Sequence, residues 1–192
     1  EKVIDYSKNF HSDFMDLYLA KECHFLIASN SGIYSLPLFF RKPTIIPNII
    51  DFSDIPAWSG KDLFILKKFY SESENRFLSF REIYEFVSKE QSDHTSHFIE
   101  QKVKLIENTR EAIREIVIDM DDRLNKTWQE TEVDVQLQER FLRLMETYGI
   151  HLPPQLKIGA IFLRNNIDLL RRLKMKVLIT GNLGYIGTVL SN

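Results

Sequence analysis

The chain has 192 residues, of which 44% are hydrophobic and 27% are charged, a composition typical of globular proteins and unlike that of disordered or fibrous ones. Its 25 Lys and Arg residues nearly balance 27 Asp and Glu residues, and the formal charge of -2 argues against a nucleic-acid partner. One cysteine, Cys23, excludes a disulfide within the chain and a four-cysteine zinc site.

The N-terminal part has the pattern of a helix, a short strand and a polar loop. Ser12 is a suitable N-cap because apolar residues recur at helical spacing over 14–19. The apolar run 24–28 has the length of a strand, and the small polar group 29–32 follows it directly. This order predicts that the polar group lies at the carboxyl end of a strand.

A second helix and a second strand follow. Residues 33–40 have a helical pattern that ends before Pro43, a residue that disfavours a continued helix. Residues 44–47 predict a strand with Asn48 at its carboxyl end. Because two buried strands joined by a helix pair in parallel with a right-handed crossover, the sequence predicts an α/β fold.

The middle of the chain has weaker patterns. Residues 49–75 are mixed in character, and we expect a loop with one short extended segment. Residues 80–88 predict a helix, 89–96 a polar loop and 102–106 a short edge strand.

Three helices are predicted over residues 108–173. Residues 108–109 are placed to cap an amphipathic helix whose apolar face runs over 113–124. A further helix covers about 135–148 and ends at Gly149, and a last one, rich in arginine, covers 158–173.

The polar group 29–32 is a candidate anion site. Unpaired backbone N–H groups and a positive helix end favour an anion such as a diphosphate at a strand-to-helix turn. Ser29, Asn30 and Ser31 add polar side chains, and Gly32 allows close approach. The alternative is a capped turn that binds nothing.

Several blocks of the sequence resemble the C-terminal half of a family of bacterial glycosyltransferases that are similar to two-domain GT-B enzymes. The resemblance covers roughly residues 5–170, in the blocks 12–19, 23–32, 41–43, 62–68, 127–129 and 159–164. It implies a Rossmann-like GT-B C-terminal domain with C-terminal helices over residues 1–173, N-terminally truncated. The implied ligand is a nucleotide-sugar donor, with the phosphates at Ser29, Asn30, Ser31 and Gly32 and with Asn48 as a further candidate.

The segment 175–192 resembles the start of a second family. Residues 176–180 have a buried-strand pattern, and the glycine pattern after them resembles the opening of extended short-chain dehydrogenases, which include NAD-dependent epimerases and dehydratases. The resemblance implies the first βα unit of a second Rossmann fold, with NAD(P) as the cofactor. The implied cofactor-binding residues are Gly181, Asn182, Leu183, Gly184, Tyr185, Ile186 and Gly187. The alternative is an ordinary βα turn.

Some residues resemble parts of metal sites, but no metal is expected. Asp119 and Asp121 form a DxD pattern, yet Met120 between them belongs to the apolar helix face, so both carboxylates are expected to face solvent. His94 and His97 lie in a stretch expected to be a polar loop and lack a third ligand.

Two further residue sets are expected to be structural. His24 and Cys23 are expected to be core residues. Arg164, Arg171 and Arg172 are expected to form a helix face, with an acceptor-binding or membrane-surface role as the alternative.

The resemblances together predict a glycosyltransferase fragment that transfers a sugar to a surface polysaccharide or glycolipid acceptor. The catalytic residues are not identified, because the base commonly comes from the half that is expected to be missing. No apolar run reaches the roughly 20 residues of a membrane span, so a cytoplasmic location is expected, including peripheral contact with the inner face of the membrane. The alternatives are an epimerase or dehydratase with a passenger N-terminal region, and a non-catalytic α/β interaction module.

Overall fold

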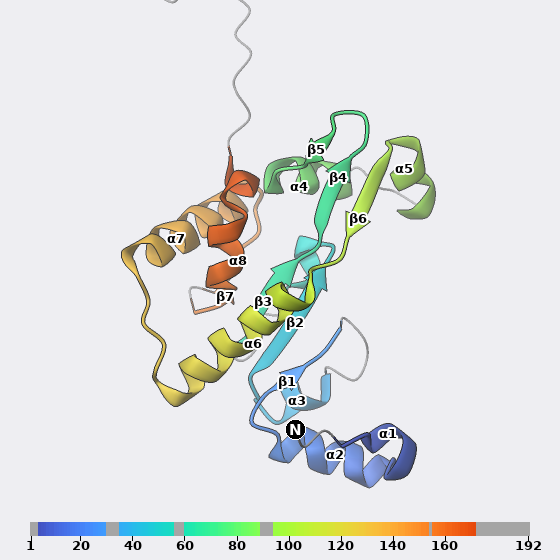
Figure 1. Cartoon of the computed structure of the whole chain (residues 1–192), viewed down its shortest axis with the longest axis vertical. Helices are drawn as coiled ribbons and strands as arrows, with labels where there is room; N and C mark the ends of the chain where they lie inside the picture. The colour runs from blue at the N-terminus through green and yellow to red at the C-terminus, as the bar shows by residue number, and fades with distance from the viewer. Residues whose placement is uncertain (1–3, 30–34, 56–59, 89–93, 154, 172–192) are drawn as a thin grey trace, which may run out of the picture.

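Two sheets surrounded by helices make up the protein (Figure 1). The computed structural model describes residues 4–29, 35–55, 60–88, 94–153 and 155–171. The parallel sheet has the order β1-β2-β3-β7 and consists of β1 (Leu26–Ile27), β2 (Thr44–Ile49), β3 (Leu63–Leu66) and β7 (Lys157–Ile158). The antiparallel sheet has the order β5-β4-β6 and consists of β4 (Lys68–Ser71), β5 (Arg76–Phe77) and β6 (Val103–Ile106). The predicted α/β class is confirmed, and the sheet is compatible with a Rossmann-like fold.

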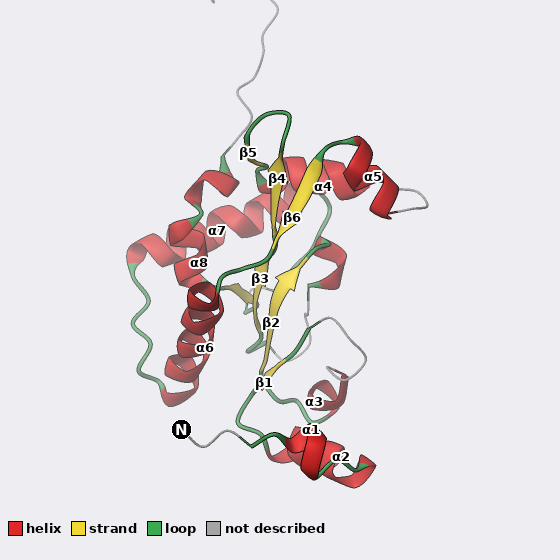
Figure 2. Cartoon of the chain, turned by 45° about the vertical axis from the view of Figure 1, so that its right-hand side comes forward, coloured by secondary structure: helices red, strands yellow, loops and turns green. Residues whose placement is uncertain are grey.

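The helices cover both sides of the strands. Figure 2 shows α6, α7 and α8 on one side of the parallel sheet and α3 on the other. In chain order, the helices are α1 (Tyr6–Asn9), α2 (Asp13–Glu22), α3 (Ser35–Phe39), α4 (Phe80–Ser88), α5 (His94–Glu100), α6 (Arg110–Asn125), α7 (Glu132–Thr147) and α8 (Ala160–Asn165). Two short 3-10 turns are η2 (Phe52–Asp54) and η3 (Ile167–Leu170).

The core is built around β3. All four of its residues are buried, because β2 and β7 flank it and helices cover it. Phe64 of β3 packs against Phe141 of α7, with ring centroids 5.9 Å apart, and Phe141 packs against Phe80 of α4 at 5.4 Å. These aromatic contacts join the sheet to helices that are distant in sequence.

The prediction of a loop with one short extended segment over 49–75 is wrong, since this stretch contains two strands in succession. β3 continues through Lys67 into β4, where buried Phe69 and Ser71 alternate with less buried neighbours. β4 pairs with β6, which is the predicted edge strand. A run of four apolar residues is a weak signal alone, and the pairing partners of β3 decide that it is a central strand.

The predicted helix over 158–173 is also corrected. Lys157 and Ile158 pair with Leu63 and Phe64 as the fourth parallel strand, and α8 begins only after Gly159. β7 satisfies the backbone groups along the open edge of β3, which a helix there would leave unpaired.

The remaining predicted helices are present with small shifts. Ser12 caps α2 by accepting from the Met15 amide, and Thr109 caps α6 by accepting from the Ala112 amide, each at 3.2 Å. α7 begins three residues before the predicted start, because Thr131 forms a capping box there. α5 includes residues 94–96, which were predicted to lie in a loop.

Candidate functional site

The carboxyl ends of β1 and β2 carry the polar residues predicted to meet a ligand. The Ala28 amide donates to the Ile45 carbonyl at 3.0 Å, so the pairing of β1 with β2 extends to Ala28. Ser29 is the next residue and is exposed. Asn30, Ser31 and Gly32 lie outside the described residues. The structure therefore places Ser29 at the carboxyl edge of the sheet, where α/β proteins bind ligands.

Asn48 has a structural contact that the sequence did not predict. It has a φ of 65°, and a register irregularity interrupts the pairing of β2 with β3 between Ile46 and Ile49. The Asn48 amide oxygen accepts from both the backbone and the side-chain N–H groups of Asn108, each at 2.8 Å. Asn108 also donates to the Leu66 carbonyl at 3.0 Å. This amide pair ties the ends of β2 and β3 to the start of α6.

A cavity of about 650 Å³ lies next to the carboxyl end of β2. Its lining residues come from the segment after β2 and from α5 and β6: Ile50, Asp51, Asp54, Phe98, Ile99, Val103 and Leu105. This volume is in the range of small-molecule sites, and so is the mainly apolar lining. No pattern in the sequence indicates this cavity, because α5 and β6 are about 50 residues away from β2 in the chain and only the fold brings them together.

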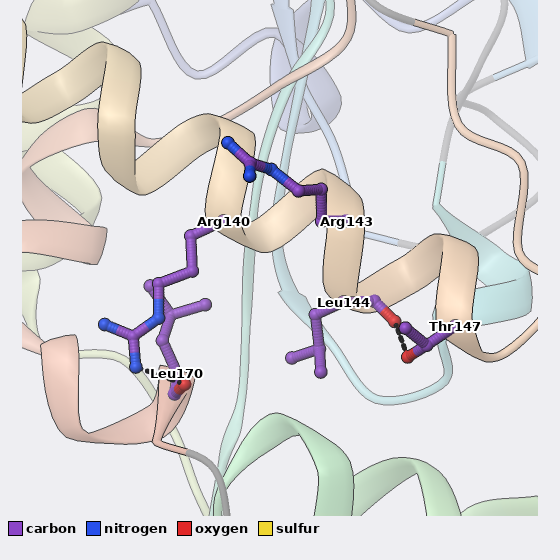
Figure 3. Close-up of a pocket in the computed structure, with 5 residues that line it drawn as sticks. All are labelled: Arg140, Arg143, Leu144, Thr147 and Leu170. Atoms are coloured by element: carbon purple, nitrogen blue, oxygen red, sulfur yellow. Dashed lines mark hydrogen bonds between the residues drawn. The ribbon is translucent and has the colours of Figure 1, made fainter.

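A second cavity, of about 440 Å³, lies between α7 and η3 and is lined by Arg140, Arg143, Leu144, Thr147 and Leu170 (Figure 3). Arg140 donates to the Leu170 carbonyl at 2.7 Å, and Arg143 pairs with Glu139 at the same distance. Both guanidinium groups thus already have protein partners, which makes this cavity a weaker candidate for an anionic ligand.

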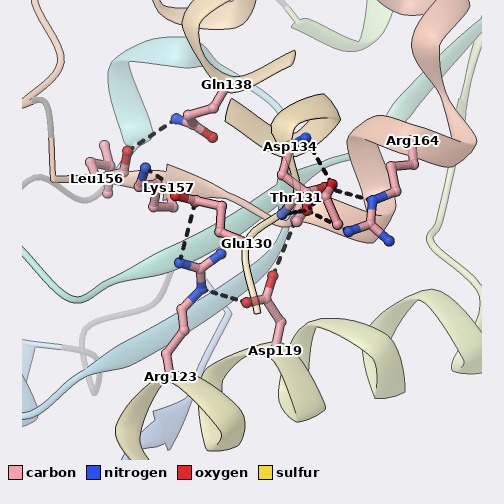
Figure 4. A network of polar contacts seen from close by, with 10 residues as sticks. Asp119, Arg123, Glu130, Thr131, Asp134, Gln138, Leu156, Lys157 and Arg164 are labelled. Atoms are coloured by element: carbon pink, nitrogen blue, oxygen red, sulfur yellow. Dashed lines mark hydrogen bonds and ion pairs between the residues drawn. The ribbon is translucent and has the colours of Figure 1, made fainter. Parts of the chain in front are cut away.

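The DxD pattern on α6 is structural, and the prediction that both carboxylates face solvent is wrong for Asp119. Asp119 is 1% exposed, accepts from the Arg123 side chain at 2.5 Å and accepts from the Ala160 amide at 3.1 Å (Figure 4). Burial raises the pKa of its carboxyl, and Arg123 and Ala160 offset part of this effect. Asp119 therefore holds the first turn of α8 against α6, while Asp121 is exposed as predicted.

A second carboxylate in the same network, that of Asp134, is the partner of Arg164. Asp134 accepts two hydrogen bonds from Arg164 at 2.5 Å and one from the Thr131 hydroxyl at 2.7 Å (Figure 4). Burial by itself raises the pKa of Asp134, but the bonds from Arg164 and Thr131 outweigh it and lower the pKa to about 2. Arg164 thus fixes α8 to α7. Arg171 donates to the Phe77 carbonyl, and Arg172 lies outside the described residues.

The histidines and the cysteine differ from the expectations. His24 is exposed, so the prediction of a core histidine is wrong: it lies two residues before β1 and is not part of the strand. His94 and His97 lie on α5, where the His97 ring packs against Phe86 with centroids 4.4 Å apart. Cys23 is half-buried after α2, and burial raises the pKa of its thiol.

The described ranges contain neither a grouped set of metal ligands nor a membrane-spanning helix. In these ranges, no three His, Cys, Asp or Glu side chains are grouped so that they could hold a metal ion. None of the helices described there is both long enough and apolar enough to cross a membrane. The predicted cofactor-binding residues 181–187, like all of 172–192, lie outside the described residues.

The blocks that carry the glycosyltransferase resemblance include central parts of the fold. Block 62–68 forms β3, where the buried Asp62 carboxylate accepts from the Thr44 amide at 2.9 Å. Block 159–164 forms α8, and a Cβ on Gly159 would lie 3.0 Å from Ile65. No family model, curated protein or solved structure matches the chain. The family assignment therefore stays a prediction from these residues.

Proposed function

We propose that the chain binds the diphosphate of a nucleotide-sugar donor and is the donor-binding half of a glycosyltransferase. The observation that carries this proposal is the position of Ser29, exposed directly beyond β1 at the carboxyl edge of a parallel sheet. Phosphate-bearing ligands of open α/β sheets bind outside this edge. The sequence after Ser29 supplies a second hydroxyl, an amide and a glycine, which are groups suited to close contact with phosphate.

In this proposal, the chain acts on the leaving group. Hydroxyl and backbone N–H donors of 29–32 stabilise the negative charge that develops on the diphosphate when the bond to the sugar breaks. The described part of α3 has only five residues, so hydrogen-bond donors contribute more than the dipole of a long helix. The acceptor is a glycan or glycolipid, and no residue of this chain is assigned as the base that deprotonates it.

Titration of the chain with UDP- and GDP-sugars tests the proposal, and CMP-sugars, which have one phosphate instead of a diphosphate, serve as the contrast. We expect one class to bind, and we expect Gly32→Trp to abolish this binding because the added side chain occupies the space of the phosphates. Ser29→Ala should weaken binding by about fivefold to tenfold, the effect of one hydrogen bond. Ser88→Ala, at an exposed serine at the end of α4, is the matched control.

Two results would contradict the proposal. Unchanged donor binding by Gly32→Trp would place the ligand elsewhere. Absence of binding by every sugar nucleotide would favour the non-catalytic interaction module, which keeps the fold without a ligand.

A further inference from the structure

The residues that line the cavity of about 650 Å³ beside β2 restrict the kind of ligand that it can bind. Five of its lining residues are apolar, and Asp51 and Asp54 are the charged ones. Carboxylates repel phosphate but accept hydrogen bonds from hydroxyl groups. The cavity therefore suits a neutral molecule that has an apolar face and hydroxyl groups.

Asp51, one of the lining residues, is held in a defined position. It follows the end of β2 by two residues, and one of its carboxylate oxygens accepts from the Ser53 amide at 2.7 Å as the cap of η2. A carboxylate has two oxygens with about four acceptor positions, so the capped group retains acceptors for a ligand. The capped oxygen also fixes the rotamer of Asp51, which lowers the entropy cost of binding.

Most of the apolar lining residues come from α5 and β6 and form an apolar wall of the cavity. Phe98 of α5 packs against Phe69 and Phe86, with ring centroids 5.6 and 4.9 Å apart, which holds its ring in place. Leu105 of β6 and the exposed Ile99 of α5 complete the wall. A rigid apolar wall of this kind suits a flat ring.

The cavity and Ser29 lie at the same edge of the sheet. β1 and β2 are parallel neighbours, and Ile27 pairs with Ile45, so β2 and the residues after it extend beyond β1 toward Asp51. At about 3.3 Å per residue of regular strand, this extension separates Ser29 from Asp51 by at most roughly 13 Å along the strand direction, since the irregularity at Asn48 shortens it. One extended ligand with an anionic part and a neutral part can reach both.

We propose that this cavity holds the nucleoside of the sugar-nucleotide donor, with the ribose hydroxyls donating to Asp51 and the base against Phe98 and Leu105. This inference rests on the proposed function, which places the diphosphate at Ser29. It assigns the two parts of the donor by charge: the anionic part lies beyond β1, and the neutral part lies between the two carboxylates and the apolar wall.

Asp51→Asn tests the contact with the ribose. Asn retains an acceptor for the Ser53 amide, so the cap of η2 is kept, while the charged acceptor is lost. We expect binding of the preferred nucleoside diphosphate to weaken roughly 10- to 100-fold, and we expect binding of inorganic pyrophosphate to stay unchanged. Asp121→Asn, at an exposed carboxylate of α6, should change neither.

Ile99→Trp tests the cavity without disturbing the core, since Ile99 is 72% exposed. The larger side chain should fill part of the cavity and weaken nucleoside diphosphate binding at least tenfold. Ile4→Trp is the matched control, because Ile4 is 74% exposed and lies far from the cavity in the chain. Thermal unfolding of both variants should match that of the parent.

The outcomes separate this inference from the function on which it rests. Nucleoside diphosphate binding that Asp51→Asn and Ile99→Trp leave unchanged would overturn the nucleoside assignment and leave the proposed function intact. Equal weakening of nucleoside diphosphate and pyrophosphate by Asp51→Asn would also overturn it. Absence of binding of both ligands to the parent chain would overturn both proposals.

Discussion

The helices at the two ends of the described chain use their apolar residues in opposite ways. α6, α7 and α8 bury theirs: Phe141 and Met145 of α7 and Met120 of α6 are 0% exposed. α2 and α3 each have a large apolar side chain in solvent, with Phe14 72% and Phe39 86% exposed. Within the described part of α2, only Ala20 is buried.

The difference shows that an apolar pattern indicates a helix face but not its partner. α7 and α8 are also joined by the Asp134–Arg164 pair, and Asp119 joins α6 to α8. α2 has a contact with α3 and an exposed stacked pair, Phe14 and Tyr18, with ring centroids 6.2 Å apart. Folding stability should therefore depend strongly on the C-terminal helices and weakly on the apolar residues of α2 and α3.

The largest expected effect is the contrast between two phenylalanines. Phe141→Ala should lower the free energy of unfolding by about 3–5 kcal/mol, because it leaves a cavity between β3, α4 and α7. Phe39→Ala should change it by less than about 0.5 kcal/mol, because its side chain is in solvent. Urea unfolding followed by circular dichroism measures both. Equal losses would show that Phe39 is covered in solution.

The two aspartates of the DxD pattern should differ next most. Asp119→Ala should cost about 3 kcal/mol, because it leaves the Ala160 amide without an acceptor and Arg123 without its buried partner. Asp121→Ala, two residues away on the exposed side of α6, should be nearly neutral. The same unfolding measurement compares these two variants. If Asp119→Ala left the free energy of unfolding unchanged, the contacts of Asp119 would not stabilise the packing of α8 on α6.

The third expected effect is a pH dependence of the folding stability that the Asp134–Arg164 pair between α7 and α8 contributes. The pKa of Asp134 is lowered to about 2 from its usual 3.8, so its charged form stabilises the fold above about pH 4, and this contribution is lost as the pH falls toward 2. Asp134→Asn should cost roughly 2 kcal/mol at pH 7. The difference from the parent should shrink between about pH 4 and pH 2 in urea titrations. A difference that stays constant over this range would mean that the Arg164 pair does not stabilise the fold.

Local signals in the sequence predicted much of the fold. Ser12 and Thr109 mark the starts of α2 and α6 because a hydroxyl at an N-cap accepts a backbone N–H four or fewer residues away. The strand-helix-strand order over 24–49 predicted the parallel pair β1 and β2. β7 was missed because its two residues become a strand only by pairing with β3, about 95 residues earlier in the chain.

Some features of the candidate site could likewise be predicted from the sequence, and others could not. The sequence predicted that Ser29 follows a strand, and the structure places it at the carboxyl edge of the sheet. The contact between Asn48 and Asn108 and the cavity between Asp51 and Phe98 join residues about 50 to 60 positions apart. No periodicity in the chain indicates such contacts, since periodicity reports only the environment of each element.

The sequence by itself determined the α/β class, the starts of α2 and α6 and the strand that ends at the polar group 29–32, because capping, periodicity and turn residues act over a few positions. The tertiary structure decided which carboxylates are buried, where the fourth strand lies and which residues line the cavity. Asp119 shows the reason most clearly. Its neighbours in sequence predict an exposed helix face, but α8 packs against that face and makes Asp119 the acceptor for the first amide of another helix.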